Sequence, residues 1–191
     1  MPLGYAEPYD PLIIFYHYAR LTSPLKLIFG FTGAILDYMF FHDEKFGPLF
    51  RKDTKTATFL ADGNYICTCT TVNDLAAYTV QAISDPDSTH DGNYFVASFQ
   101  TTFNDMLKTY EKSRGVKLTV ETTFNYKEAE KQLAEAREKI PRHRHQEYIP
   151  FAYTRMVSKK DAFATDPVHS RIWSHIKPTS WEQFLEEHPE I

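Results

Sequence analysis

Tyr16 and Arg20 lie four residues apart in the chain. On a helix this spacing places both on one face. A guanidinium stays charged near neutrality, so Arg20 can lower the pKa of a phenol or hold an anion, but it is a poor general base. His17 lies between them, and a histidine titrates near neutrality. We therefore predict Tyr16, Arg20 and His17 as catalytic candidates; the alternative is a packed tyrosine, a solvated arginine and a structural histidine.

The segment that carries these residues is predicted to be a helix over residues 10–22. Pro11 suits its first turn, and Pro24 prevents its continuation. The short apolar run of residues 27–31 predicts a buried strand after this helix, with a bend at Gly30 and Gly33.

Consecutive aromatic residues follow the bend, in residues 37–41. They predict a short helix or a loop that faces a pocket. The alternative is a loop acid at Asp37 and core aromatics at Tyr38 and Phe40.

The rest of the chain alternates between strand-like and helix-like patterns. Residues 56–60 and 65–70 are rich in β-formers and flank Asp62-Gly63, which predicts a hairpin. Capping residues predict helices that begin after Thr71 or Asn73, after Thr102, and after Thr179-Ser180. A further helix is expected over 126–140, a half-exposed strand over 116–121, another strand over 93–98, and a long loop over 161–179. The fold class is therefore α/β (mixed α+β).

The composition excludes several classes of function. The net charge is −4 and no long basic run occurs, so we expect no nucleic-acid binding. The most apolar segment, residues 25–41, is interrupted by Lys26 and Asp37, so we expect no membrane span. The first ten residues lack the pattern of a signal peptide, which favours a cytoplasmic location. Cys67 and Cys69 are predicted to be small buried residues, and no metal site is predicted.

The glycines do not form a dinucleotide-binding motif. A Rossmann-type site needs G-x-G-x-x-G between a strand and a helix, because backbone must approach the pyrophosphate closely. The chain has seven glycines, and no three of them have this spacing.

The order of the segments resembles the C-terminal portion of the NmrA-like, isoflavone-reductase-like family, which is an atypical branch of the short-chain dehydrogenases and reductases. Four stretches carry the resemblance: FGFTGAILDYMFF (29–41), ADGNYICTCTTVNDLAAYTVQAISDP (61–86), GNYFVASFQTTFNDMLKTYEKSRGVKL (92–118) and KPTSWEQFLEEHPE (177–190).

The resemblance implies a remnant of a Rossmann-type fold, with NAD(P)H as the family cofactor. Residues 1–50 would be a residual Rossmann helix and strand, and residues 51–191 the substrate region of a single domain truncated at its N-terminus. Related reductases use Tyr-x-x-x-Lys, or a lone lysine, on the helix where Tyr16 and Arg20 stand. The family places substrate-lining residues after the following strand, so the resemblance makes Asp37, Tyr38 and Phe40 our candidates for binding substrate. The first strands and the phosphate loop are missing from this sequence, so we expect that the chain does not bind the dinucleotide alone.

Three hypotheses about function follow. The first is descent from an NAD(P)-dependent oxidoreductase that acts on small, apolar or aromatic, secondary-metabolite-type substrates. The second is a cofactor-free isomerase or cyclase that uses an aromatic pocket lined by Tyr16, Tyr38 and Phe40. The third is a regulatory or binding module without catalysis. In each case an incomplete parallel sheet would expose an edge. We expect that a second copy or a partner chain covers this edge, that the fold has been remodelled, or that the sequence is a truncated product.

Overall fold

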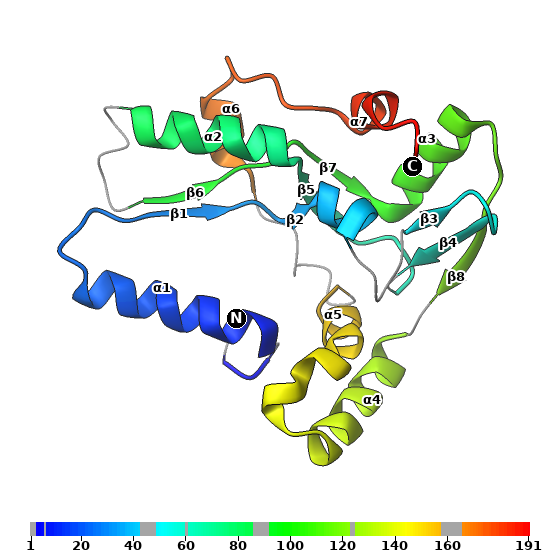
Figure 1. Ribbon diagram of the computed structural model, residues 1–191, viewed down its shortest axis with the longest axis horizontal. Coiled ribbons are helices and arrows are strands. Elements are labelled where there is room, and N and C mark those ends of the chain that lie inside the picture. The colour runs from blue at the N-terminus through cyan, green and yellow to red at the C-terminus, as the bar shows by residue number, and fades with distance from the viewer. Residues whose placement is uncertain are drawn as a thin grey trace.

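Three small sheets carry the strands (Figure 1). The computed structural model describes residues 3–5, 7–42, 49–59, 61–85, 92–122, 125–157 and 166–191. One sheet pairs β1 (Ile28–Phe31) with β6 (Gly92–Phe95) in parallel. In the second, β5 (Ile66–Thr70) lies between β2 (Ala34–Ile35), parallel to it, and β7 (Phe99–Thr102), antiparallel. In the third, β4 (Thr56–Phe59) lies between the antiparallel β3 (Phe50–Arg51) and the parallel β8 (Thr119–Thr122).

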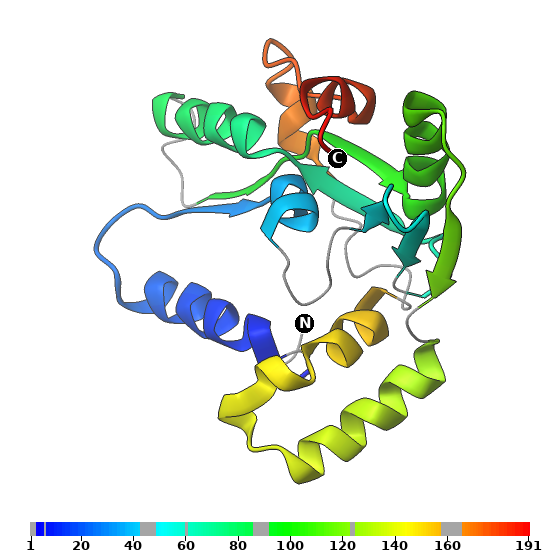
Figure 2. The same cartoon turned by 45° about the vertical axis from the view of Figure 1, so that its right-hand side comes forward.

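Two helices flank the β1–β6 pair on opposite sides. Helix α1 (Asp10–Thr22) begins at the predicted residue, with proline in its first turn, and α2 (Val72–Ser84) begins after the predicted cap Thr71. Figures 1 and 2 place α1 below the pair and α2 above it. In the described part of the chain, the far edge of β1 pairs with no other strand. The prediction that an incomplete parallel sheet has an exposed edge applies to this side of β1.

Gly33 sets the bend between β1 and β2. Its φ is +67°, and a Cβ there would lie 2.2 Å from the backbone oxygen of Thr68. Only glycine permits both the left-handed backbone and this close approach. The Thr70 hydroxyl donates to the Thr32 carbonyl oxygen at 2.6 Å and holds the same crossing. The bend therefore carries the chain from the first sheet into the second.

The predicted hairpin around Asp62-Gly63 is wrong. Strands β4 and β5 belong to different sheets and do not pair with each other. Gly63 does have a left-handed backbone, with φ of +70°, and the Asn64 N–H donates to the Asp62 carboxylate at 3.0 Å. The left-handed turn at Asp62-Gly63 is therefore present, but it carries the chain from one sheet to another. Strand β4 pairs with β3 and β8, and β5 pairs with β2 and β7.

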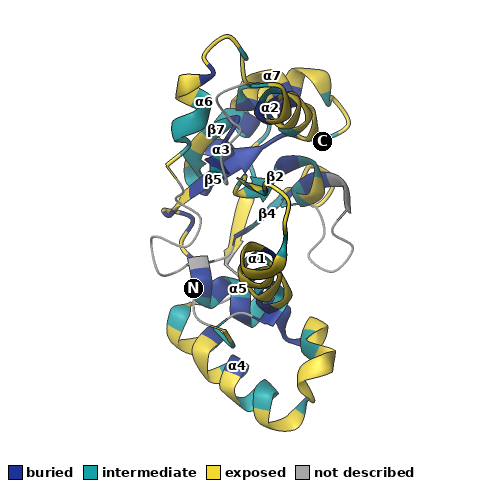
Figure 3. Ribbon diagram, turned by 90° about the vertical axis from the view of Figure 1, so that its left-hand side faces the viewer, coloured by how far each residue is buried: buried dark blue, intermediate teal, exposed yellow. Residues whose placement is uncertain are grey.

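The largest core lies where the second and third sheets meet α3 (Phe103–Arg114) and α7 (Trp181–Glu187). The predicted caps are confirmed: Thr102 accepts from the Asp105 N–H, and Ser180 forms a reciprocal capping box with Gln183. Figure 3 shows buried residues along β5 and β7 of the second sheet. Cys67 and Cys69 are buried side by side in this core, with Sγ atoms 3.5 Å apart, as the strand periodicity predicts.

A helical arm extends from the rest of the chain. It contains α4 (Tyr126–Lys139), the 3₁₀ segment η4 (Arg142–Glu147) and α5 (Ile149–Val157), whose first turn contains Pro150. A proline is tolerated there, because the N–H that it lacks would have no partner within the helix. The arm contacts the N-terminal turn η1 (Glu7–Tyr9), where Arg137 donates to both oxygens of Glu7 at 2.6 and 2.8 Å.

A short helix, α6 (Val168–Ile172), lies in the region that was predicted to be a long loop. Its side chains bind the edge of β6 that faces away from β1. The Phe95 N–H donates to His169 Nδ1 at 3.0 Å, and the Ala97 N–H donates to the Ser170 hydroxyl at 2.8 Å. Among the described residues, no helix is both long and apolar enough to cross a membrane.

Asp74 in the first turn of α2 joins three segments. Its carboxylate accepts hydrogen bonds from the Ser98 hydroxyl and from both the N–H and the hydroxyl of Thr179, at 2.8 and 3.1 Å for Thr179. Asp74 is buried. Because a buried charge is stable only when its hydrogen bonds are satisfied, these contacts tie α2, the segment before β7 and the segment before α7 together.

Replacing Asp74 with alanine should lower the free energy of unfolding by about 3 kcal/mol, since the donors of Ser98 and Thr179 lose their charged acceptor. Urea unfolding followed by tryptophan fluorescence measures this loss. Asp105→Ala is the matched control, because Asp105 is also an acid in a first helical turn but is exposed. Equal losses for the two variants would contradict the role of Asp74.

The Glu7–Arg137 pair should make the arm sensitive to acid. Burial alone would raise the pKa of Glu7, but the hydrogen bonds and charge of Arg137 lower it overall. A lowered carboxyl pKa stabilises the fold above the unfolded value of about 4.3, and this stabilisation is lost as the pH falls further. The chain should therefore lose stability between about pH 5 and pH 3.

Arg137→Met should remove this pH dependence and cost about 2 kcal/mol at neutral pH, because Glu7 is left buried without its partner. Urea unfolding at a series of pH values measures both effects. Arg171→Met is the control, since its partner Asp166 is exposed. The same acid sensitivity in Arg137→Met and the unchanged protein would show that another group is responsible.

Candidate functional site

The Tyr16 hydroxyl is the centre of a hydrogen-bonded group on the β1–β6 pair. Arg20 Nη1 donates to Tyr16 Oη at 2.9 Å. Asn93 Nδ2 also lies 3.0 Å from Tyr16 Oη, and Asn93 Oδ1 lies 3.2 Å from it. The structure thus brings Tyr16 and Arg20 together on one helical face, as their spacing predicts, and adds a third residue.

The strand register explains how Asn93 reaches the phenol. Asn93 on β6 lies directly opposite Phe29 on β1. The Tyr16 ring packs on Phe29, with 4.6 Å between ring centroids, and lies 6.3 Å from the ring of Phe31. Because the aromatic side chains of β1 support the ring, the hydroxyl is held within reach of β6. A hydroxyl whose ring and oxygen are both held in place is suited to a defined proton-transfer geometry.

The surroundings of Tyr16 lower the pKa of its phenol. The hydrogen bond from Asn93 makes the largest contribution. Burial, the second effect in size, raises the pKa, and the hydrogen bond and positive charge of Arg20 lower it further. The two hydrogen bonds and the charge stabilise the phenolate relative to the phenol. The phenol can therefore give up its proton more readily than an ordinary tyrosine.

His17, the third catalytic candidate, contacts the ring of Tyr16. Its side chain is exposed, and its ring meets the edge of Tyr16 with 5.2 Å between centroids. It has no hydrogen-bond partner among the described residues. The geometry favours contact with the Tyr16 ring over proton exchange with its hydroxyl; a catalytic role for His17 stays a prediction.

Asp37 and Tyr38 lie beyond the bend, near the start of α2. The Val72 N–H donates to Asp37 Oδ2 at 2.9 Å, so this carboxylate caps the free N–H groups of α2 together with Thr71. Tyr38 is exposed and begins a short π-helix, η2 (Tyr38–His42). Substrate binding by either residue stays a prediction, while the capping role of Asp37 is a structural one.

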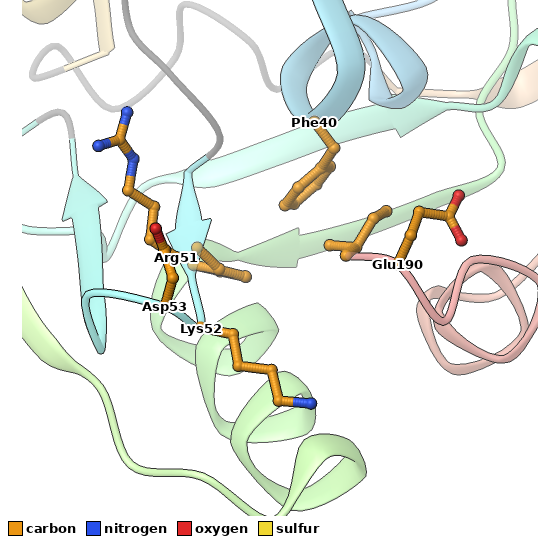
Figure 4. Close-up of a pocket in the computed structure, with 7 residues that line it drawn as sticks. Phe40, Arg51, Lys52, Asp53 and Glu190 are labelled. Atoms are coloured by element: carbon orange, nitrogen blue, oxygen red, sulfur yellow. The ribbon is translucent and has the colours of Figure 1, made fainter.

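Phe40 packs in the main core and also lines a cavity. Its ring stacks on Trp181 with 5.3 Å between centroids. The cavity has a volume of about 510 Å³ (Figure 4). Its described lining residues are Phe40, Phe50, Arg51, Lys52, Asp53, Glu190 and Ile191. Tyr16 and Tyr38 are not among them, so the structure does not bring the three aromatic candidates into one pocket within its described part.

Metal chemistry finds no support in the described residues, which contain no group of three or more potential ligands. The arrangement around Tyr16 is instead suited to acid–base chemistry on a polar group of a ligand. Arg20 can hold a negative charge there, and the phenol can exchange a proton.

Solved structures show what this fold is similar to. AtPrR2 with NADP+ and (+)-pinoresinol matches with a TM-score of 0.71 and 15% identity, over 98% of this chain and 58% of that one. An isoflavone reductase matches with a TM-score of 0.65 and 17% identity, over 94% and 57%. A nucleoside-diphosphate-sugar epimerase from Staphylococcus aureus matches with a TM-score of 0.67 and 13% identity, over 97% and 61%.

The predicted fold is therefore confirmed: the chain has the α/β fold of isoflavone-reductase-like proteins and spans about three fifths of the length of these neighbours. No protein-family model and no curated protein sequence matches it. At these identities the likeness concerns the fold, and chemistry must be argued from the residues.

Asn93 is the residue of the site that the sequence analysis missed. It lies 77 residues from Tyr16 along the chain. An asparagine at the start of a short strand carries no signal of its own, since turns and strand ends commonly contain this residue. Only the parallel register of β1 and β6 could have identified it.

The phenol of Tyr16 should titrate below the ordinary tyrosine value, and Asn93→Leu and Arg20→Met should each raise its pKa. NMR titration of protein labelled with ¹³C at the tyrosine Cζ measures this, with Tyr16→Phe to assign the resonance. Lys26→Met is the control, because it removes a positive charge that makes no hydrogen bond to Tyr16. An unshifted Tyr16 pKa would contradict the geometry.

Proposed function

We propose that this chain is the substrate-handling portion of an NAD(P)-dependent reductase-type protein that acts on small apolar or aromatic molecules. The observation that carries the proposal is the hydrogen-bonded group of Tyr16, Arg20 and Asn93, on a fold similar to that of solved reductases. The neighbours named as reductases support a reaction in which a polar group of the substrate gains a proton.

The chain's own residues do not fit the dinucleotide. Its seven glycines lack the spacing of a phosphate-binding turn. At Gly33, the space that a Cβ would fill is taken by the backbone of Thr68. We therefore assign the dinucleotide to a part of the protein outside this chain and derive no hydride step here. What the chain contributes is the orientation and protonation of the substrate.

In this role Tyr16 exchanges the proton. Its hydroxyl would give a proton to an oxygen of the substrate, and the resulting phenolate would be stabilised by Asn93 and Arg20, which already hydrogen bond to it. Arg20 stays charged throughout, so it acts as a fixed positive charge. Phe29 and Phe31 on β1 support the Tyr16 ring and favour an apolar ligand nearby.

The isomerase hypothesis has less support. It needs a closed pocket shared by Tyr16, Tyr38 and Phe40, and the described cavity includes only Phe40 of the three. The hypothesis of a binding module without catalysis assigns no role to the hydrogen-bonded group of Tyr16, Arg20 and Asn93.

Titration of the purified chain with NADPH tests the proposal. Nicotinamide fluorescence and calorimetry should show no saturable binding, because the phosphate-binding turn lies outside the chain. Micromolar binding would contradict the assignment of the dinucleotide to a part outside this chain and would favour an autonomous oxidoreductase. In the same preparation, calorimetry with (+)-pinoresinol as an aromatic probe should show weaker binding for Tyr16→Phe than for the control Tyr126→Phe, since Tyr126 lies on the arm, where its hydroxyl donates to Glu130 at 3.0 Å.

A further inference from the structure

A row of stacked rings crosses the β1–β6 pair beside the Tyr16 hydroxyl. The register places Phe31 opposite Phe95, and their rings stack with 4.9 Å between centroids and 19° between planes. On the far side of β6, the His169 ring of α6 stacks on Phe95 with 6.3 Å between centroids and 27° between planes. The faces of the Phe95 ring are therefore occupied by its neighbours, and its edge is left for a further contact.

The row lies at the end of the sheet where ligands of α/β proteins bind. Phe31 and Phe95 are the last residues of β1 and β6, and these two strands run in the same direction (Figure 1). Ligands of open parallel sheets bind outside the carboxyl ends of the strands. Phe31 is 38% exposed and Phe95 is half-buried. The two rings therefore form a partly exposed apolar surface at the end of the sheet where a ligand is expected.

The row adjoins the hydrogen-bonded group of Tyr16. Asn93 and Phe95 are two residues apart on β6, so their side chains share one face of the pair and are spaced by about 7 Å along the strand. Asn93 Nδ2 lies 3.0 Å from Tyr16 Oη. A ligand oxygen bound at Tyr16 and a ligand ring packed on Phe31 and Phe95 must therefore be close together in one molecule. An oxygen on the ring, or one carbon from it, meets this requirement.

The stacking also determines which kind of ring fits. Because Phe31 and Phe95 stack on each other across the strands, they turn their edges outward. The edge of an aromatic ring carries partial positive charge and prefers the negatively charged face of another aromatic ring. The Tyr16 ring already meets Phe31 in this manner, with 69° between the planes. A saturated ring has no such face, so the pair favours a flat aromatic ring.

We propose that Phe31 and Phe95 bind an aromatic ring of the substrate, and that Tyr16 binds an oxygen on that ring or one carbon from it. The proposal rests on the proposed function, which names apolar and aromatic molecules alike, and narrows it to oxygen-bearing aromatic compounds. His169 is a positioning residue, because it stacks on the Phe95 ring and its Nδ1 accepts the Phe95 N–H at 3.0 Å.

NMR titration of the purified chain with naphthalenemethanol and with its fully hydrogenated counterpart tests the proposal. The two probes carry the same hydroxyl and differ in the ring alone. The unchanged chain should bind the aromatic probe at least about threefold more tightly, as expected for an edge-to-face contact. Phe31→Leu and Phe95→Leu should each remove most of this preference, since leucine is apolar but has no ring. Far-UV circular dichroism checks that the variants are folded.

The control Phe15→Leu should keep the preference. Phe15 is an exposed aromatic residue next to Tyr16 in sequence, but it lies about 100° round the helix from it. Tyr16→Phe should weaken the binding of both probes to a similar extent and also keep the preference, because it removes the bond to the oxygen and not the contact with the ring.

Equal affinity for the two probes would overturn the proposal and leave the proposed function standing. The same holds for a preference that survives both leucine variants at Phe31 and Phe95. A dimeric unchanged chain that Phe31→Leu makes monomeric in sedimentation equilibrium would also overturn it, since a second copy would then cover the pair. Unaltered binding of both probes by Tyr16→Phe would instead contradict the proposed function, and with it the assignment of the oxygen.

Discussion

The parallel pairing of β1 with β6 is the constraint on which the rest of the structure depends. It joins segments more than sixty residues apart, with Ile28 opposite Gly92 and Phe31 opposite Phe95. The pair is only two strands wide, so its stability must come from what lies around it. Helices α1 and α2 flank its two sides. On the outer side of β6, side chains of α6 accept hydrogen bonds from the backbone N–H groups of Phe95 and Ala97. Without this pairing, α1 would have no surface on which to pack.

The candidate site is a direct product of that pairing. The register places Asn93 beside Phe29, and the Tyr16 ring rests on Phe29 while its hydroxyl reaches Asn93. One face of α1 therefore carries both the packing that fixes the helix and the polar group that can do chemistry. On the opposite face of the same helix, Ile14, Tyr18 and Leu21 are exposed.

Buried charges hold the remaining parts in position around this pair. Asp74 joins the start of α2 to the segments before β7 and α7, and Glu7 joins the N-terminal turn to the arm through Arg137. Both are single carboxylates with several donors, and both connect segments that are distant in sequence. Such contacts add specificity to a fold whose sheets are small, because a misplaced segment would leave a buried charge without partners.

Several local features of the structure follow from the sequence alone. Helix α1, the caps at Thr71, Thr102 and Ser180, and the common face of Cys67 and Cys69 follow from spacing and from free N–H groups within one turn. The adjacency of Tyr16 and Arg20 follows from the helix alone.

Tertiary structure decided everything that depends on which segments pair. The turn at Asp62-Gly63 has the local chemistry of a hairpin, yet β4 and β5 enter different sheets, because sheet partners are selected by packing over the whole chain. For the same reason Asn93 joined the site, Asp37 became a helix cap and Phe40 entered the core. A side chain's type and its near neighbours limit what it can do, but only long-range pairing determines what it meets.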